Sequence, residues 1–472
     1  MSIVRDNMAP LMFAGMILFM LIGYPAAFAL AATGLFFGFI GIELGLITPD
    51  FLGNLTYQLF GIISNDLLLA IPFFTFMGAI LERCGLAEDL LDSIGQLFGP
   101  VRGGMAYAVI FVGAILGAIT GTVAASVIAM GVIAMTPMLR YGYSTRHTMG
   151  VIAASGTITQ LIPPSLVLIV LADVLGRSVG DMYAGAIGPS LIQIGLFCAW
   201  VGIVSIVWPR SVPALPLEAR TLRGWALWQK CLRGMIPSLG LIFLVLGTIF
   251  LGLATPSEAG AMGVVGAIAL AAFYGTLSWK LLYQGMSTTM RLTAMVVFIL
   301  IGARVFSLVF QGVGGKEWIE HLLTALPGGQ IGFLIFVNIF IFVVAFFLDF
   351  FEIAFIIIPL LAPVAMKLGI DLVWFGVLIC ANIQTSFMHP PFGFALFYLR
   401  GIAPPSIKTS DIYWGAVPWL CLQLVLVGIL IFWPESVTYW LDKGTGVDPS
   451  KIDIDVPMPQ LPQPIDLSAP KN

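Results

Sequence analysis

The chain has 472 residues, of which 59% are hydrophobic and only 10% are charged, and its formal net charge is −3. Soluble domains carry about 25% charged residues, whereas the mean hydropathy here is +1.03 over the whole length. These values exclude a soluble domain on a single anchor and a basic nucleic-acid-binding protein. They predict an all-α polytopic membrane protein, because many windows reach the roughly 20 apolar residues that a span needs.

Hydropathy predicts the membrane segments in chain order. The first residues carry Arg5 and lead directly into an apolar run, which we interpret as a first span and not as a removed signal. The apolar segments cover residues 9–45 (turning near Gly23-Tyr24-Pro25), 50–83, 104–137, 148–175, 183–208, 236–253, 259–277, 290–313, 330–366, 372–399 and 412–433. Several are too long for one crossing or are broken by Gly, Pro and polar residues. A bilayer tolerates irregular backbone only inside protein or beside a water-filled cavity, so these breaks should face inward.

A small-residue stretch with hydroxyl groups interrupts the third apolar segment. Residues 117–131 read GAITGTVAASVIAMG, and they lie inside an apolar stretch, residues 104–137, that is too long for one crossing. We predict a re-entrant hairpin that places Thr120, Gly121 and Thr122 near the middle of the membrane. The alternative is a packing face of small residues four apart, which brings helices close together in lipid.

The next segment runs into a double proline. Residues 155–165 read SGTITQLIPPS, and proline removes a backbone donor and clashes with the carbonyl one turn back. The freed carbonyls, with the hydroxyls of Thr157 and Thr159, suit a small cation. The start of the following half-helix suits an anion. The alternative is an ordinary proline kink relieved by hydroxyl side chains.

A polar connection then divides the chain near its middle. Residues 209–235 hold five basic residues, one acid and three prolines, so the positive-inside rule predicts a cytoplasmic linker. In the second half, Arg304 lies in an apolar run and either pairs with an acid or receives a carboxylate. Asp349 and Glu352 stand within FFLDFFEIAF, either at membrane depth, where charged residues are functional by default, or at an exposed hairpin tip.

The second half repeats the broken segment of the first. Residues 382–391 read NIQTSFMHPP, with Asn382, Gln384, Thr385 and Ser386 able to coordinate or donate. His389 precedes the double proline and is either a hydrogen-bonded packing residue or a proton carrier with a direct role in coupling. Interrupted segments at matching places in two halves are the best sequence indication of a transporter binding site.

Other functional classes lack their motifs in this sequence. It has no GxxxxGK[ST] nucleotide loop, no HExxH and no GxSxG, so neither an ATPase nor an enzyme is predicted. The three histidines and five cysteines are too scattered for a metal site or a disulfide framework. The polar, proline-rich tail, residues 434–472, is expected to be loosely ordered.

Several of these segments together resemble one transporter family. The matching stretches are residues 71–104, GTVAASVIAMGVIAMTPMLRYGY (121–143), SGTITQLIPPS (155–165), ATPSEAGAMG (254–263), residues 346–371 and NIQTSFMHPPFGFALFYLRG (382–401). With them the chain resembles the large membrane (DctM-like) subunit of tripartite ATP-independent periplasmic (TRAP) transporters, within the ion-transporter superfamily. The resemblance covers nearly the whole chain.

The resemblance implies a fold, a mechanism and partners. It implies N-terminal scaffold helices (1–66) and two inverted repeats (67–208 and 236–433), each with a re-entrant hairpin and a broken helix, in an elevator-type transporter of the bacterial inner membrane. It implies sodium-driven uptake of an organic acid, without another cofactor. The acid is delivered by a periplasmic solute-binding protein, and a small four-helix membrane subunit supports the scaffold. The alternative is a stand-alone carboxylate symporter of the same superfamily.

The resemblance also implies site residues. One sodium site would use Thr120, Gly121, Thr122, Ser155, Gly156, Thr157 and Pro163, and a second would use Asn382, Thr385 and Met388 with the hairpin after Asp349. This sequence departs from the family pattern, because Thr120-Gly121-Thr122 replaces Ser-Gly-Ser, His389 replaces a threonine, and two glutamines occupy places that are usually apolar or small. The residues predicted to contact substrate are Gln160, Ser165, Arg304, Gln384 and His389.

Overall fold

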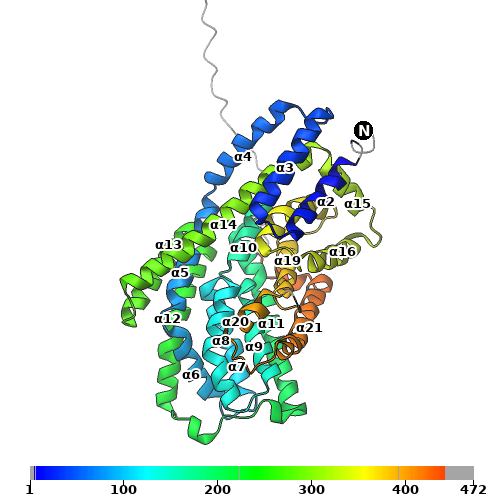
Figure 1. The fold of residues 1–472 in the computed structure, drawn as a ribbon. Coiled ribbons are helices and arrows are strands. Elements are labelled where there is room, and N and C mark those ends of the chain that lie inside the picture. Colours follow the sequence, from blue (N-terminus) through cyan, green and yellow to red (C-terminus); the bar gives the residue numbers. More distant parts are fainter. Residues whose placement is uncertain (1–4, 6, 223, 392, 442–472) are drawn as a thin grey trace, which may run out of the picture.

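The structure is a computed structural model that describes residues 5–441, apart from residues 6, 223 and 392. Every regular element in this part of the chain is helical, as predicted (Figure 1). Eight helical segments among the described residues are long and apolar enough to span a bilayer. They are α3 (Ala26–Glu43), α8 (Val123–Arg140), α11 (Val179–Val207), α12 (Trp225–Phe250), α13 (Pro256–Phe273), α14 (Trp279–Gly312), Phe350–Lys367 and α21 (Thr409–Phe432).

Two further spans are bent, which raises the number of candidate spans to ten. In the first, η1 (Pro49–Gly53) and α4 (Asn54–Ile63) meet α5 (Asp66–Glu82) at 47°; in the second, α15 (Gly315–Thr324) meets α16 (Gly329–Val344) at 117°. The segment Phe350–Lys367 consists of α17 (Phe350–Glu352), a π-helical turn η5 (Ile353–Ile357) and α18 (Ile358–Lys367). The Gly, Pro and polar residues within the apolar segments predict breaks of this kind.

The remaining helices are shorter, and most of them belong to hairpins or broken helices. They are α2 (Met8–Leu21), α6 (Leu86–Phe98), α7 (Gly104–Thr120), α9 (Thr145–Thr157), η2 (Ile158–Gln160), α10 (Leu166–Leu175), η3 (Pro209–Ser211), η4 (Leu217–Ala219), α19 (Leu372–Ser386), α20 (Phe394–Ile402) and α22 (Glu435–Thr438). The predicted turn near Gly23-Tyr24-Pro25 separates α2 from α3. In Figure 1, α12 and α13 stand along the left side of the molecule, α21 lies on the right, and α9 and α11 lie between them.

Small residues allow close packing between distant helices. A Cβ at Gly302 of α14 would lie 2.3 Å from the Ala27 carbonyl oxygen of α3, and a Cβ at Gly34 would lie 3.0 Å from the Phe306 backbone. Without a hydrophobic drive between helices in lipid, such close backbone approach supplies the packing. The pair α3–α14 is therefore fixed by its glycines.

Two predicted segments differ from the structure at their ends. The cytoplasmic linker was expected to run over residues 209–235, but α12 already begins at Trp225. No proline interrupts the chain between Pro216 and Pro237, and one face of the early α12, including Leu227 and Cys231, is buried, so packing extends the helix. The predicted tail 434–472 begins with α22, which packs on α11, and its residues 442–472 lie outside the described residues.

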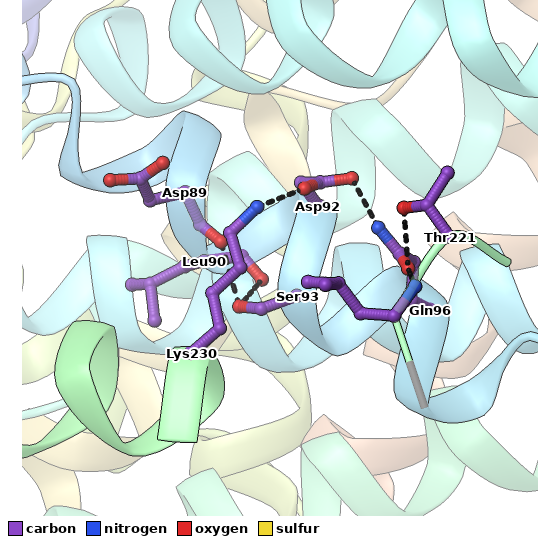
Figure 2. A network of polar contacts seen from close by, with 8 residues as sticks. Asp89, Leu90, Asp92, Ser93, Gln96, Thr221 and Lys230 are labelled. Atoms are coloured by element: carbon purple, nitrogen blue, oxygen red, sulfur yellow. Dashed lines mark hydrogen bonds and ion pairs between the residues drawn. The ribbon is translucent and has the colours of Figure 1, made fainter. Parts of the chain in front are cut away.

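The amphipathic helix α6 is hydrogen-bonded to the linker and to α12 (Figure 2). It is not among the helices that are able to span the bilayer. Lys230 of α12 donates to Asp92, and Gln96 Nε2 donates to the other oxygen of that carboxylate at 3.0 Å. Gln96 Oε1 in turn accepts from Leu222 N at 3.0 Å and from Thr221 Oγ1 at 3.3 Å. One glutamine thus connects the end of α6 with the linker.

Replacing Lys230 by Met is expected to lower stability only slightly, by less than about 1 kcal/mol, because the exposed pair is screened by water. Burial raises the pKa of Asp92, but the hydrogen bonds from Lys230 and Gln96 outweigh it and hold that pKa below its ordinary value. The stabilisation is therefore present at neutral pH and is lost as the pH falls below about 3.9. Thermal unfolding in detergent at pH 7 and pH 3 measures it, and Lys280→Met on exposed α14 surface is the control.

Candidate functional site between two hairpins and two broken helices

The first re-entrant hairpin consists of α7 and α8. Between them Gly121 has φ +64°, a left-handed conformation that favours glycine, and Thr122 is extended. Across the turn, Thr120 Oγ1 and Ser126 Oγ are 2.6 Å apart. The hairpin tip predicted at Thr120-Gly121-Thr122 is therefore present, and the hydroxyl of Thr120 is buried in the protein.

The first broken helix packs directly against this hairpin. It consists of α9, the short η2 and, after Pro163-Pro164, α10. Thr159 Oγ1 donates to Ser126 Oγ at 3.0 Å. A Cβ at Gly113 of α7 would lie 2.6 Å from Ser155 Cβ, and a Cβ at Gly156 would lie 2.3 Å from Val127 Cγ2. Hairpin and broken helix touch through their glycines and hydroxyls.

The double proline leaves carbonyl oxygens that side chains then occupy. Ser165 Oγ donates to Gln160 O at 2.5 Å and accepts from Val167 N at 3.2 Å, so that it caps α10. Ser190 of α11 donates to Leu161 O at 3.1 Å. The predicted free carbonyls are thus hydrogen-bonded, because buried C=O groups require partners.

The second half contains a matching arrangement. Asp349 caps α17 between α16 and α18: Phe350 N donates to Asp349 Oδ1 at 2.7 Å, and Asp349 N donates to Glu352 Oε2 at 3.0 Å. Both acids therefore lie at a hairpin tip, but this tip is half-buried and not exposed as the second predicted setting requires. The broken helix α19–α20 packs beside it, with Asn382 Nδ2 donating to Asn338 O of α16 at 2.8 Å.

Direct hydrogen bonds join the two broken helices. Gln384 Nε2 of α19 donates to Thr157 O of α9 at 3.0 Å, and Cys380 Sγ lies 3.2 Å from Gln160 O. Gln423 Nε2 of α21 donates to Thr157 Oγ1 at 3.0 Å. The segments that the sequence predicts to be equivalent in the two halves are thus in contact in the core of the molecule.

A cavity of about 210 Å³ lies where these elements meet. Each hairpin tip, each broken helix and α14 contribute to its wall. Its lining residues are Gly121, Thr122, Val123, Ala124, Gln160, Leu166, Val167, Leu292, Met295, Asp349, Phe350, Phe351, Phe387, Phe394 and Tyr398. The helix N-termini of α8, α10 and α20 all contribute lining residues, so partial positive charge is directed at the cavity.

The predicted site residues are distributed unequally around this cavity. Gly121, Thr122 and Gln160 line it. Ser155 and Gly156 contact the first hairpin, whose Thr120 bonds Ser126 across the turn. Thr157 is bound by Gln384 and Gln423, and Ser165 caps α10. On the second broken helix, Asn382, Gln384, Thr385 and Met388 are buried in α19 and the turn after it.

Three predicted residues lie elsewhere. Arg304 is exposed on α14 and is not among the residues that line the cavity, because Gly302 and Phe306 turn the opposite face of that helix toward α3; its predicted contact with substrate stays a prediction. Pro163 lines a separate apolar cavity of about 510 Å³ beside α12. His389 is buried and stacks on Phe346, with ring centroids 3.7 Å apart.

The aromatic wall of the cavity was missed by the sequence reasoning. Its members all follow or flank a predicted break: Phe350, Phe351, Phe387, Phe394 and Tyr398. The usable signal was the density of aromatic residues around Asp349 and around the second double proline. Phenylalanine in an apolar run ordinarily indicates packing or lipid contact, so these residues do not by themselves indicate that they line a cavity.

Two hairpins and two broken helices surround a cavity inside the protein. Irregular backbone that lines a binding site within the membrane in this way defines a membrane transporter. The chain belongs to the DctM component family of tripartite ATP-independent periplasmic transporters, whose family model matches residues 13–436. It is therefore a multi-pass transport subunit of the bacterial inner membrane and not an enzyme.

Known relatives cover most of the chain. It is 31% identical to the C4-dicarboxylate TRAP transporter large permease protein DctM of Pseudomonas aeruginosa, over 84% of this chain and 92% of that protein. It is 28% identical to the ectoine/5-hydroxyectoine large permease UehC of Ruegeria pomeroyi, over 92% and 99%. The isethionate permease DctMQ of Oleidesulfovibrio alaskensis is 26% identical over 90% of this chain and 65% of its own length.

A solved structure shares the fold. The YdaH transporter of Alcanivorax borkumensis matches with a TM-score of 0.56 and 18% identity, over 81% of this chain and 87% of that one. At this identity the likeness concerns the fold alone.

Proposed function

We propose that this chain is the permease subunit of a sodium-coupled uptake system for a small organic carboxylate. The observation that carries the proposal is the cavity between the two hairpin tips, with the start of α8 and of α10 on its wall. Helix N-termini bind anions through free backbone N–H groups and the helix dipole. Thr122 makes no side-chain cap at α8, so the first N–H groups of that helix remain for a carboxylate.

The coupling ions are assigned to the two hairpin–helix junctions. In the first, the hydroxyls of Thr120, Ser126 and Thr159 lie within one hydrogen-bonded chain beside the carbonyl of Gly156. In the second, Thr385 Oγ1 donates to Asn382 O at 2.6 Å next to Asn338. Neutral oxygen groups of this kind suit a hard monovalent cation. Transport then moves the hairpins and broken helices as an elevator against the remaining helices.

The proposed partners are a periplasmic solute-binding protein and a small membrane subunit. The support is membership of a tripartite family, together with one relative in which the permease is named DctMQ. The chain covers only 65% of that relative's length, which leaves room there for further segments.

The proposal is tested by uptake into proteoliposomes. The chain is reconstituted with the small subunit and the binding protein encoded beside it, and a radiolabelled carboxylate bound by that protein is supplied outside. We expect accumulation driven by an inward sodium gradient and at least tenfold less with potassium. Equal uptake without sodium would refute the coupling, and equal uptake by the chain alone would refute the tripartite assignment.

A further inference from the structure

We propose that the solute carries a cationic group as well as a carboxylate, and that the cavity holds this group between Asp349 and the surrounding aromatic rings. The inference rests on the proposed function, because it assigns the solute to the same cavity. It arises from a difference between the two halves of the cavity wall. One half presents the starts of α8 and α10, and the other presents a carboxylate and π-faces beside the start of α20.

The acidic half is formed by the second hairpin. Asp349 lines the cavity, and its position is fixed because Oδ1 accepts from Phe350 N while its own N–H is bound to Glu352. The described lining residues include no lysine, arginine or histidine, and no ion pair to Asp349 occurs within the described residues. Asp349 is half-buried, and a carboxylate in such a position is stabilised by a nearby opposite charge, so a cation is favoured at this point of the cavity.

Aromatic rings surround the same region. Five rings line the cavity with Asp349: Phe350, Phe351, Phe387, Phe394 and Tyr398. The ring centroids of Phe350 and Phe351 are 4.9 Å apart, and those of Phe387 and Phe394 are 6.0 Å apart. A cation within about 6 Å of a ring centroid is attracted by the ring quadrupole, and groups of rings recognise quaternary ammonium ligands in this way. Rings beside an unpaired carboxylate therefore favour a weakly hydrated cation.

The opposite half comes from the first hairpin and its broken helix. Val123 and Ala124 begin α8, and Leu166 and Val167 begin α10, so the positive ends of two helix dipoles lie at this half of the wall. This half suits the carboxylate of the solute. A dicarboxylate of similar size would instead bring a second negative charge toward Asp349, which is unfavourable where water screens little.

The test compares small carboxylates whose second group is positively charged, neutral or negatively charged. Binding to the full chain, purified in detergent with sodium, is measured by isothermal titration calorimetry with three solutes. They are glycine betaine, 3,3-dimethylbutanoate, in which a neutral tert-butyl group replaces the trimethylammonium group, and succinate. We expect the betaine to bind at least tenfold more tightly than either of the others. Asp349→Asn keeps a capping oxygen for Phe350 N but removes the charge, and we expect the preference to fall to about onefold.

The control is Asp371→Asn, which changes an exposed acid that caps α19 through Trp374 N and does not line the cavity, and it should retain the preference. The inference is overturned if the wild-type chain binds all three solutes equally or binds none, or if Asp349→Asn keeps the preference. It is also overturned if Asp349→Asn abolishes the sodium dependence of binding while leaving the preference intact, because Asp349 then holds the coupling ion. A preference for betaine without any sodium effect would sustain the inference and refute sodium coupling.

Discussion

Replacing Gly156 by alanine is expected to reduce transport on the order of 100-fold. The added Cβ would lie 2.3 Å from Val127 Cγ2, 2.8 Å from Val127 Cα and 2.9 Å from Val127 N. A side-chain atom can rotate away, but two of these neighbours are backbone atoms, so the first hairpin must shift from α9. Shifts of about 1 Å at a functional site can lower rates by about two orders of magnitude, and overpacking costs about 1–3 kcal/mol of stability.

The measurement is initial uptake in the reconstituted system, together with the melting temperature in detergent. Gly195→Ala is the matched control, because Gly195 lies in α11 with nothing within 4 Å of an added Cβ, and alanine should there leave transport unchanged. Combining Gly156→Ala with Val127→Ala removes the closest contact and should restore transport in part. Wild-type uptake by Gly156→Ala would show that the hairpin does not depend on this contact.

The breaks in the helices were predictable from the sequence because their causes are local. Pro163-Pro164 and Pro390-Pro391 interrupt a helix wherever they occur, and Gly121 supplies a left-handed turn within a run of small residues. Each of these residues restricts or frees the backbone through its own covalent structure. The hairpins and broken helices therefore follow from a few residues, without knowledge of what packs around them.

The partners of the broken helices were not predictable, because they come from distant parts of the chain. Gln423 binds the hydroxyl of Thr157, 266 residues away, and Cys380 approaches Gln160 O across 220 residues. Likewise, the charge of Arg304 predicts a functional role, but the direction of its side chain depends on how α14 packs against α3. Local patterns indicate where a helix ends but not which helix satisfies its carbonyl groups.

Replacing Gln384 by leucine is expected to weaken both the fold and the coupling between the two halves. The fully buried Gln384 donates to Thr157 O at 3.0 Å, so the substitution removes the donor of a buried carbonyl, which costs about 1–3 kcal/mol. Thr157 belongs to the first predicted ion site, and Gln384 adjoins Thr385 of the second. We therefore expect the sodium dependence of uptake to lose cooperativity, with a Hill coefficient that falls toward 1.

A second buried glutamine separates this effect from a mere loss of polarity. Gln193 of α11 is fully buried, and neither of its amide atoms has a hydrogen-bond partner among the described residues. Gln193→Leu therefore removes a desolvated amide without breaking a bond, and unfolding stability should stay equal or rise, with unchanged sodium cooperativity. Denaturant unfolding and sodium titrations of both variants decide the matter. If both glutamines respond alike, the bond from Gln384 to Thr157 transmits nothing between the halves, and the two sites are coupled through the rigid packing of α9 and α19 instead.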